Sequence, residues 1–300
     1  MNRLLQTVEV ADSEAVLSTW EQQVRAAWQP SAARWLDGIA IDGKTLRGAR
    51  RLGVADTHPL SACCQRLGLV LADVAVPEAT NEVGAVGPLL ERLLSNETVT
   101  FDAAFTQYAV ASQVVHQGGA YFLVLKGNQP TLLREAQHAT SWPARYLGRA
   151  HAVHLAHGRL EGRTLVAASA QDLGWPHARQ VLRLHRRFTS KRTGAVLHEE
   201  TVYDAVTSLR REQASPQQLL QLWQAHWRIE SLHWLRDVVF GEDRATTHTG
   251  HAPQALAALR NLAISFIHRW RGREVTAARE YYASHPAVLF CHLGLVPRRL

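Results

Sequence analysis

The sequence predicts an α/β protein built around a mixed β-sheet, and three observations support this prediction. Short apolar segments rich in β-branched residues, such as GIAIDG and AYFLVLKGN, are bounded by glycine or polar residues, as buried strands are. Amphipathic helical segments alternate with these strands over the first half of the chain. Hydrophobic residues make up 46% of the 300 residues and charged residues 20%, which is the composition of a globular protein and not of a disordered one.

The elements of the first half follow one another in a clear order. An amphipathic helix is expected over residues 12–28, with Asp12 or Ser13 as its N-terminal cap. Three strands then follow, at GIAIDG, HPLSACCQR and LGLVLADVAV. After them come a helix at residues 82–95, a strand at ETVTFDAAF, a helix at TQYAVASQVVHQGG and a strand at AYFLVLKGN. This order predicts an α/β arrangement with a mixed sheet.

The predicted secondary structure changes twice in the second half of the chain. From about residue 150 to 208 the pattern is one of strands and turns, and it includes the basic hairpin RLHRRFTSKRTGAVLHEETVY. Helical periodicity returns at residue 215, where Ser215 is a cap and Pro216 occupies the first helical position. Helix then dominates to about residue 273.

The charge and the cysteine content indicate which kind of partner and which cellular compartment to expect. The formal net charge is +7 and the sequence pI is near 9.8, which favours a polyanionic partner, nucleic acid first. The three cysteines, Cys63, Cys64 and Cys291, argue against a disulfide framework and for a reducing compartment. No apolar run approaches the roughly 20 residues of a membrane helix, and the N-terminus has no signal-like apolar core. We therefore expect a cytoplasmic protein that does not associate with a membrane.

Residues 38–45, GIAIDGKT, match the phosphate-binding loop pattern G-x-x-x-x-G-K-[ST]. The surrounding sequence argues against that interpretation, because the β-branched run lies between the two glycines, where the flexible loop should be. Gly48 and Gly53 would also interrupt the helix that must follow. The segment is better interpreted as a strand that presents Asp42 at the carboxyl edge of the sheet. The alternative is an ordinary turn aspartate in the dipeptide DG.

Asp102 repeats this arrangement, since it follows the strand TVTF and precedes Ala103 and Ala104. If the two strands are neighbours, Asp42 and Asp102 come within reach of a shared cation. Mg²⁺ prefers hard oxygen ligands such as these carboxylates. Two such ions, about 3.5–4 Å apart, activate a nucleophile and stabilise a leaving oxygen in phosphoryl transfer.

A third carboxylate, Glu230, is expected on the helix that follows residue 215. At 100° per residue, the side of the helix that bears Glu230 also bears Trp223, His226, Trp227, His233, Trp234 and Asp237. We interpret this side as facing a cleft, and the alternative is a wide buried face. A zinc site formed by His226, Glu230 and His233 is disfavoured, because no fourth ligand is evident nearby.

Basic and polar side chains near these acids are candidates for binding DNA phosphates. The candidates are Lys44, Arg47, Lys126 and Asn128 beside the acids, and Arg186, Arg187 and Lys191 in the basic hairpin. The alternative in each case is an ordinary solvated charge.

Several segments, in the same order along the chain, resemble one known family. The segments are IAIDGKTLRGA, VTFDAAFTQ, YFLVLKGNQPTL, HGRLEGR and HWRIESLHWLRDVVFGEDRATTHTGHAPQALAALRNLAISF. They are similar to insertion-sequence transposases of the ISAs1 type, the H-repeat-associated proteins, within the broader IS4-like group of DDE transposases. The similarity runs over roughly residues 1–290.

The resemblance implies a ribonuclease H-like mixed sheet flanked by helices, with a β-rich insertion between the second and third catalytic acids. It implies a DDE triad at Asp42, Asp102 and Glu230 that uses Mg²⁺ or Mn²⁺ to cleave double-stranded DNA at transposon ends and to join the 3′ hydroxyl to a target. Synapsis of two ends implies a homodimer on DNA. Where related enzymes carry an arginine four residues before the glutamate, this chain has His226, which we count among the DNA-binding candidates.

The resemblance also suggests a division of the chain. The expected parts are an N-terminal helical segment at 1–37, the first part of the catalytic domain at 38–149, the β-rich insertion at 150–208, helices carrying the third acid at 209–273 and a C-terminal tail at 274–300. Family members usually carry a further N-terminal helical region, so the first part is interpreted as a remnant of it. Two alternatives stay open: a truncated, catalytically inactive DNA-binding remnant, and a metal-dependent nuclease that cuts DNA without joining it.

Overall fold

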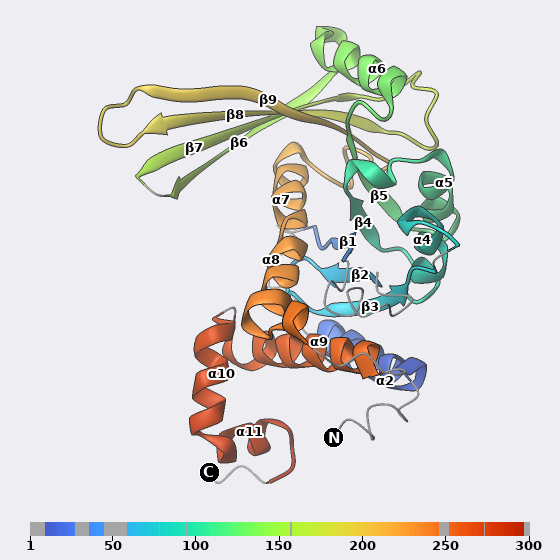
Figure 1. Ribbon diagram of the computed structural model, residues 1–300. Coiled ribbons are helices and arrows are strands. Elements are labelled where there is room, and N and C mark those ends of the chain that lie inside the picture. Colours follow the sequence, from blue (N-terminus) through green and yellow to red (C-terminus); the bar gives the residue numbers. More distant parts are fainter. Residues whose placement is uncertain are drawn as a thin grey trace. The chain divides into compact units, whose positions relative to one another are not determined.

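A computed structural model describes residues 10–27, 36–44, 59–77, 79–93, 95–156, 158–245, 252–272 and 274–296 (Figure 1). The chain forms two compact units, which we describe separately. The first unit contains residues 1–29, 43–79 and 228–300, and the second contains residues 30–42 and 80–227. The DNA-binding candidate Arg47 lies outside the described residues, so its role stays a prediction.

The second unit contains a large mixed sheet. Its strands are β1 (Ile39–Gly43), β4 (Thr98–Phe101), β5 (Ala120–Leu125), β6 (Tyr146–Ala156), β7 (Arg159–Ser169), β8 (Gln180–Ser190) and β9 (Val196–Thr207). They lie in the order β1-β4-β5-β9-β8-β7-β6. β1, β4 and β5 are parallel, whereas β9 runs antiparallel to β5 and the remaining pairs are antiparallel. The mixed α/β fold predicted from the sequence is therefore confirmed.

Helices cover this sheet on both faces. They are α4 (Glu82–Glu91), α5 (Tyr108–His116), α6 (Pro130–Ser141) and α7 (Pro216–His226), with the short turns η1 (Ala103–Phe105) and η2 (Pro143–Arg145). α7 packs on one face through Trp223, whose ring meets Phe122 of β5 edge-on with 5.2 Å between the ring centroids. α4 and α5 cover the opposite face of β4 and β5 (Figure 1). α6 was not among the expected elements, although Pro130 at its first position is a typical start signal.

The four long strands β6 to β9 extend well past the end of β5 (Figure 1). Only the last residues of β9 pair with β5, in a register that joins Leu125 to Asp204 and Phe122 to Thr207. The outer parts of β6 to β9 form an antiparallel projection, which we call the arm (residues 150–165 and 184–203). The β-rich region expected at 150–208 thus begins at Tyr146 and continues the sheet of the second unit.

The first unit is mainly helical and includes one β-hairpin among its described elements. These are α2 (Val10–Ala27), β2 (Pro59–Cys64), β3 (Val70–Ala75), α8 (Arg228–Trp234), η3 (Leu235–Val239), η4 (Glu242–Arg244), α9 (Ala252–Arg271), α10 (Val275–Ser284) and α11 (Pro286–His292). The hairpin turns at Gly68, whose φ of +72° and close approach to His268 exclude a Cβ atom. α2 and α9 pack against β3 and against each other. No described helix is long and apolar enough to span a bilayer.

The helix expected to run on from residue 215 is divided in the structure. α7 ends at His226, Trp227 is its C-cap, and α8 begins at Arg228 in the other unit. Trp223 was expected on the same side as Glu230, but it is only 1% exposed and packs in the core of the second unit. For Trp223 and His226 the alternative of a buried face therefore holds, because α7 packs that side against the sheet.

Candidate active site at the carboxyl ends of the parallel strands

Asp42 and Asp102 lie next to each other at the carboxyl ends of β1 and β4. The two strands are parallel and pair Ile41 with Phe101, so the next residue on each strand is an aspartate. Side chains alternate along a strand, so both aspartates point to the face opposite the fully buried Ile41 and Phe101. The expected pairing of these strands is confirmed, and it places two carboxylates side by side at one edge of the sheet.

The C-terminal end of α7 covers the face that bears the aspartates. Thr100, two residues before Asp102, is hydrogen-bonded to Nδ1 of His226 at 2.8 Å. His226 is only 4% exposed, and burial lowers its pKa to about 4, although the nearby charge of Asp102 acts in the opposite direction. His226 is therefore neutral at physiological pH and fixes α7 to β4. Its expected role in DNA binding stays a prediction.

The segment after β5 holds the segment after Asp102 in place. Asn128 donates its side-chain amide to the carbonyl oxygen of Ala103 at 2.7 Å, and Gln129 donates to the carbonyl oxygen of Thr106 at 2.9 Å. Both acceptors belong to the chain that follows Asp102 through η1. Asn128 thus restrains the backbone next to Asp102. Gln129 was missed as a site residue, although it stands in the same KGNQ segment.

Lys126 lies against Asp102. Its Nζ is 3.3 Å from Oδ1 of Asp102, and the two side chains are 43% and 37% exposed. An ion pair this accessible contributes at most about 1 kcal/mol to stability, so it does little to hold the fold together. The two adjacent carboxylates are of the chemical type that a divalent cation takes, because carboxylate oxygens are preferred ligands of Mg²⁺ and Mn²⁺.

Glu230 belongs to the first unit, whereas Asp42 and Asp102 belong to the second. It is exposed in the first turn of α8, whose buried side is formed by Ile229 and Leu232. Within the described residues, no three His, Cys, Asp or Glu side chains are grouped closely enough to hold a metal ion. The joint site of the three acids therefore stays a prediction.

Lys44, two residues after Asp42, is buried in the first unit. Its side chain is 6% exposed, and its Nζ lies 2.5 Å from Oδ1 of Asp237 and 3.4 Å from Oε2 of Glu242. The expected role of Lys44 in DNA binding stays a prediction. Nothing in the local sequence marks this ion pair, because Lys44 and Asp237 are 193 positions apart.

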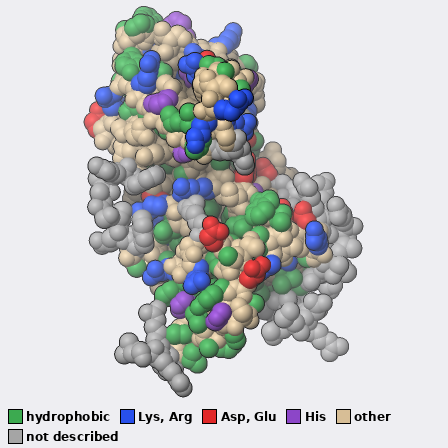
Figure 2. All heavy atoms as spheres, turned by 90° about the vertical axis from the view of Figure 1, so that its left-hand side faces the viewer, with side chains coloured by type: hydrophobic (Ala, Val, Ile, Leu, Met, Phe, Trp, Pro, Cys, Tyr) green, Lys and Arg blue, Asp and Glu red, His purple; other side chains and the backbone are tan. Residues whose placement is uncertain are grey.

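The arm carries basic residues on both of its faces, since the pleat directs Arg186 and Arg187 to opposite sides. Arg186 donates from Nε to Glu161 at 2.8 Å, and its guanidinium lies 5.0 Å from the centre of the Phe188 ring. Arg187 and Lys191 are exposed. Figure 2 shows Lys, Arg and His side chains gathered on the upper part of the surface, where the ends of the arm face the viewer. The arm therefore exposes Arg187 and Lys191, and the role of its basic residues in DNA binding stays a prediction.

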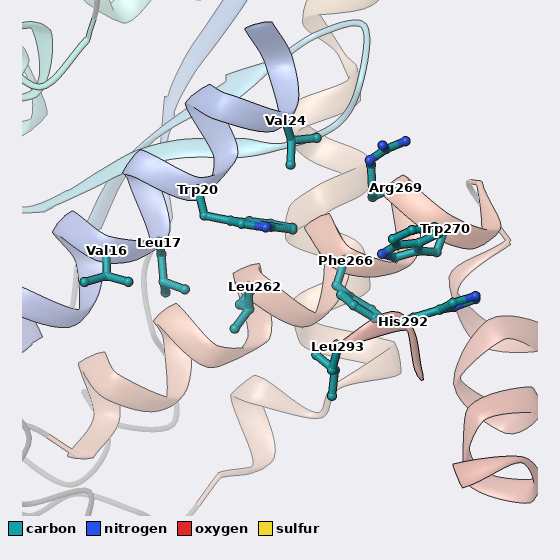
Figure 3. A pocket seen from close by; sticks show the side chains of 10 residues that line it. All are labelled: Val16, Leu17, Trp20, Val24, Leu262, Phe266, Arg269, Trp270, His292 and Leu293. Carbon is teal, nitrogen blue, oxygen red and sulfur yellow. The ribbon is translucent and has the colours of Figure 1, made fainter. Parts of the chain in front are cut away.

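An apolar pocket of about 440 Å³ lies in the first unit between α2, α9 and α11 (Figure 3). Trp20 and Leu262 form part of its wall, and the stacked rings of Trp270 and His292, with centroids 4.5 Å apart, lie at one end. None of the described candidate site residues lines this pocket. It is therefore a feature of the packing of these helices and not of the carboxylate site.

Comparison with known proteins gives one family match and several relatives. The family described as "Transposase DDE domain" matches residues 36–266. The chain is 27% identical over 263 residues to "Putative transposase YncI" of Escherichia coli O157:H7, covering 82% of this chain and 66% of that protein. It is 27% identical over 245 residues to "H repeat-associated putative transposase YhhI" of Escherichia coli K12, covering 77% of this chain and 64% of that protein. The chain thus spans less than two thirds of the length of these relatives.

Proposed function

Because the chain belongs to the transposase DDE domain family, we propose that it is an ISAs1-type transposase that cleaves and joins the DNA of an insertion sequence. The observation that supports this proposal best is the adjacent placement of Asp42 and Asp102 by the paired strands β1 and β4. Glu230 of α8 follows them in the chain, in the order of a DDE triad.

Asp42, Asp102 and Glu230 would hold Mg²⁺ or Mn²⁺, which when bound lowers the pKa of a water and stabilises charge on the leaving oxygen. Other residues of the chain would position these ligands and balance their charge. Asn128 restrains the backbone after Asp102, and Lys126 balances part of the charge of the Asp102 carboxylate. Hydrolysis breaks a P–O3′ bond at the element end, and the freed 3′ hydroxyl then attacks a target phosphodiester and displaces its 3′ oxygen.

The substrate under this proposal is double-stranded DNA, both at the element ends and at the target. The net charge of +7 favours such a partner, and Arg187 and Lys191, which are exposed on the arm, would bind its phosphates. Arg186 contributes less, because Glu161 already balances part of its charge. Two ends must be brought together before joining, so a homodimer on DNA is part of the proposal.

Cleavage of a labelled duplex that carries the element end tests this function. The wild type should nick the duplex only with Mg²⁺ or Mn²⁺. Asp102→Asn removes a metal-binding charge and keeps the side-chain shape, so it should abolish cleavage and leave DNA affinity nearly unchanged. Cleavage that persists in this variant would show that the site assignment is wrong.

The same preparations distinguish the two alternatives. Salt-sensitive DNA binding by the wild type without cleavage in either metal would identify an inactive DNA-binding remnant. Cleavage without joining, in an assay that supplies a target duplex and a free 3′ hydroxyl end, would identify a nuclease.

A further inference from the structure

A buried ion cluster surrounds Lys44 in the first unit. The Lys44 ammonium contacts Asp237 and Glu242, at 2.5 and 3.4 Å, and the Glu242 side chain is only 3% exposed. An ammonium group removed from water costs several kcal/mol unless opposite charges surround it. The two carboxylates supply those charges, so this contact is part of the fold and differs from a surface ion pair.

The cluster extends to two arginines. Arg236 is fully buried and donates two hydrogen bonds to Glu242, from Nε at 2.9 Å and from a terminal nitrogen at 3.0 Å. Arg260 of α9 lies 3.5 Å from the same carboxylate. Glu242 thus contacts three cations, which joins η3, η4 and α9 to the chain at Lys44.

The backbone of Lys44 is held as well. Its N–H donates to the carbonyl oxygen of Pro59, at the start of β2, at 2.9 Å. Only Gly43, the last residue of β1, separates Lys44 from Asp42. A residue fixed through both its backbone and its side chain leaves its near neighbours little freedom to move. The cluster therefore restrains the end of the strand that presents Asp42.

Asp237, the ion-pair partner of Lys44, lies close in sequence to the third acid, Glu230. It lies in η3, which follows α8 directly, and α8 carries Glu230. The Lys44–Asp237 contact therefore ties the chain just after Asp42 to the helical segment that begins with the third acid. This link is made within the first unit, to which both Lys44 and Glu230 belong.

We propose that Lys44 is a positioning residue for Asp42 and not a contact for DNA. This inference rests on the proposed function, because it takes Asp42 to be a metal ligand. The Lys44 ammonium is buried against Asp237 and Glu242, so it has no surface to offer a phosphate. Loss of the ion pair removes the side-chain part of the restraint on Lys44, so the end of β1 is held less firmly, and a ligand displaced by about 1 Å binds its metal more weakly.

The test compares the wild type with Lys44→Met, Asp237→Asn and the double variant. Met keeps most of the length of the lysine side chain and removes its charge. Asp237→Asn leaves Lys44 paired with Glu242, so it provides a milder variant if Lys44→Met does not fold, and thermal unfolding checks each protein. Lys191→Met is the matched control, because it removes one lysine charge from an exposed position of the arm.

Two quantities are measured: the affinity for Mn²⁺ without DNA, by calorimetry, and the salt dependence of DNA affinity. Lys44→Met should weaken Mn²⁺ binding about tenfold, and Asp237→Asn should weaken it less. The double variant should resemble Lys44→Met, since the two residues act through one contact. The slope of log affinity for DNA against log salt should stay unchanged in these variants, whereas Lys191→Met should reduce it by about one.

Unchanged Mn²⁺ affinity in both folded single variants would overturn the inference. A reduced salt slope with unchanged Mn²⁺ affinity would overturn it too, and would identify Lys44 as a DNA contact. Failure of the proposed function has another signature: the wild type binds Mn²⁺, Asp42→Asn abolishes that binding, and no DNA is cleaved. A wild type that binds no Mn²⁺ at all would overturn both.

Discussion

Glu21 makes the stability of the first unit depend on pH. Its side chain is 2% exposed and accepts a hydrogen bond from Ser265 at 2.6 Å, while Ser265 accepts one from the backbone N–H of Val70 at 3.3 Å. Burial raises the pKa of Glu21 to about 8; the Ser265 bond opposes this rise, and the charge of Asp73 adds to it. Glu21 is therefore largely protonated in the folded protein at neutral pH.

The size of the effect follows from this pKa. It rises from 4.5 to about 8, and each pH unit of the difference corresponds to about 1.4 kcal/mol, so the full effect is on the order of 5 kcal/mol. Between the two values, the unfolded chain has lost a proton that the folded chain keeps. The contribution of Glu21 to the free energy of unfolding is therefore most favourable below pH 4.5, falls as the pH rises toward 8, and levels off above that.

Glu21→Gln removes this titration and keeps an oxygen that can accept the hydrogen bond from Ser265. Urea unfolding of both proteins from about pH 5 to about pH 9 gives a difference in which the other titrating groups largely cancel. The variant should match the wild type closely near the acidic end and should be more stable at the alkaline end by several kcal/mol, up to about 5. A constant difference over this range would refute the reasoning. Glu280→Gln, at an exposed position of α10, is the matched control and should show no such trend.

Three further predictions concern the core, the candidate site and the arm. Trp223→Ala removes the ring that packs on Phe122 and should lower the free energy of unfolding by about 3–5 kcal/mol in urea titrations; a loss below about 1 kcal/mol would contradict this. Asn128→Ala releases the carbonyl of Ala103 and should slow metal-dependent cleavage about tenfold in single-turnover assays, with DNA affinity unchanged; a normal rate would contradict it. Arg187→Gln should reduce the salt slope of DNA binding by about 0.9, and an unchanged slope would exclude Arg187 from the DNA contacts.

The proximity of Asp42 and Asp102 could be predicted, because the strand that precedes each aspartate is visible in the local sequence. Each aspartate follows a short run of β-branched residues, and the carboxyl ends of parallel strands meet at one edge of a sheet. The register could not be predicted in the same way. A shift of one residue between Ile41 and Phe101 would have directed the two carboxylates to opposite faces, and no local signal distinguishes the two registers.

The burial of Lys44 and His226 could not be predicted, because their partners are distant in the sequence. Lys44 meets Asp237 across 193 positions, and His226 meets Thr100 across 126. In the sequence, both residues are polar side chains close to acidic residues, and this pattern is the same for a buried ion-pair partner and for a DNA contact. The division of the helix at Trp227 is hidden for a related reason, since the apolar spacing continues across it and only packing shows that the chain enters another unit.

All four strands of the arm continue into the inner sheet of the second unit, and β9 is one strand from Val196 to Thr207. Its inner end is hydrogen-bonded to β5 up to Leu125, the residue just before Lys126. A single strand therefore joins the outer hairpin of the arm to β5, whose last residue precedes the lysine that contacts Asp102.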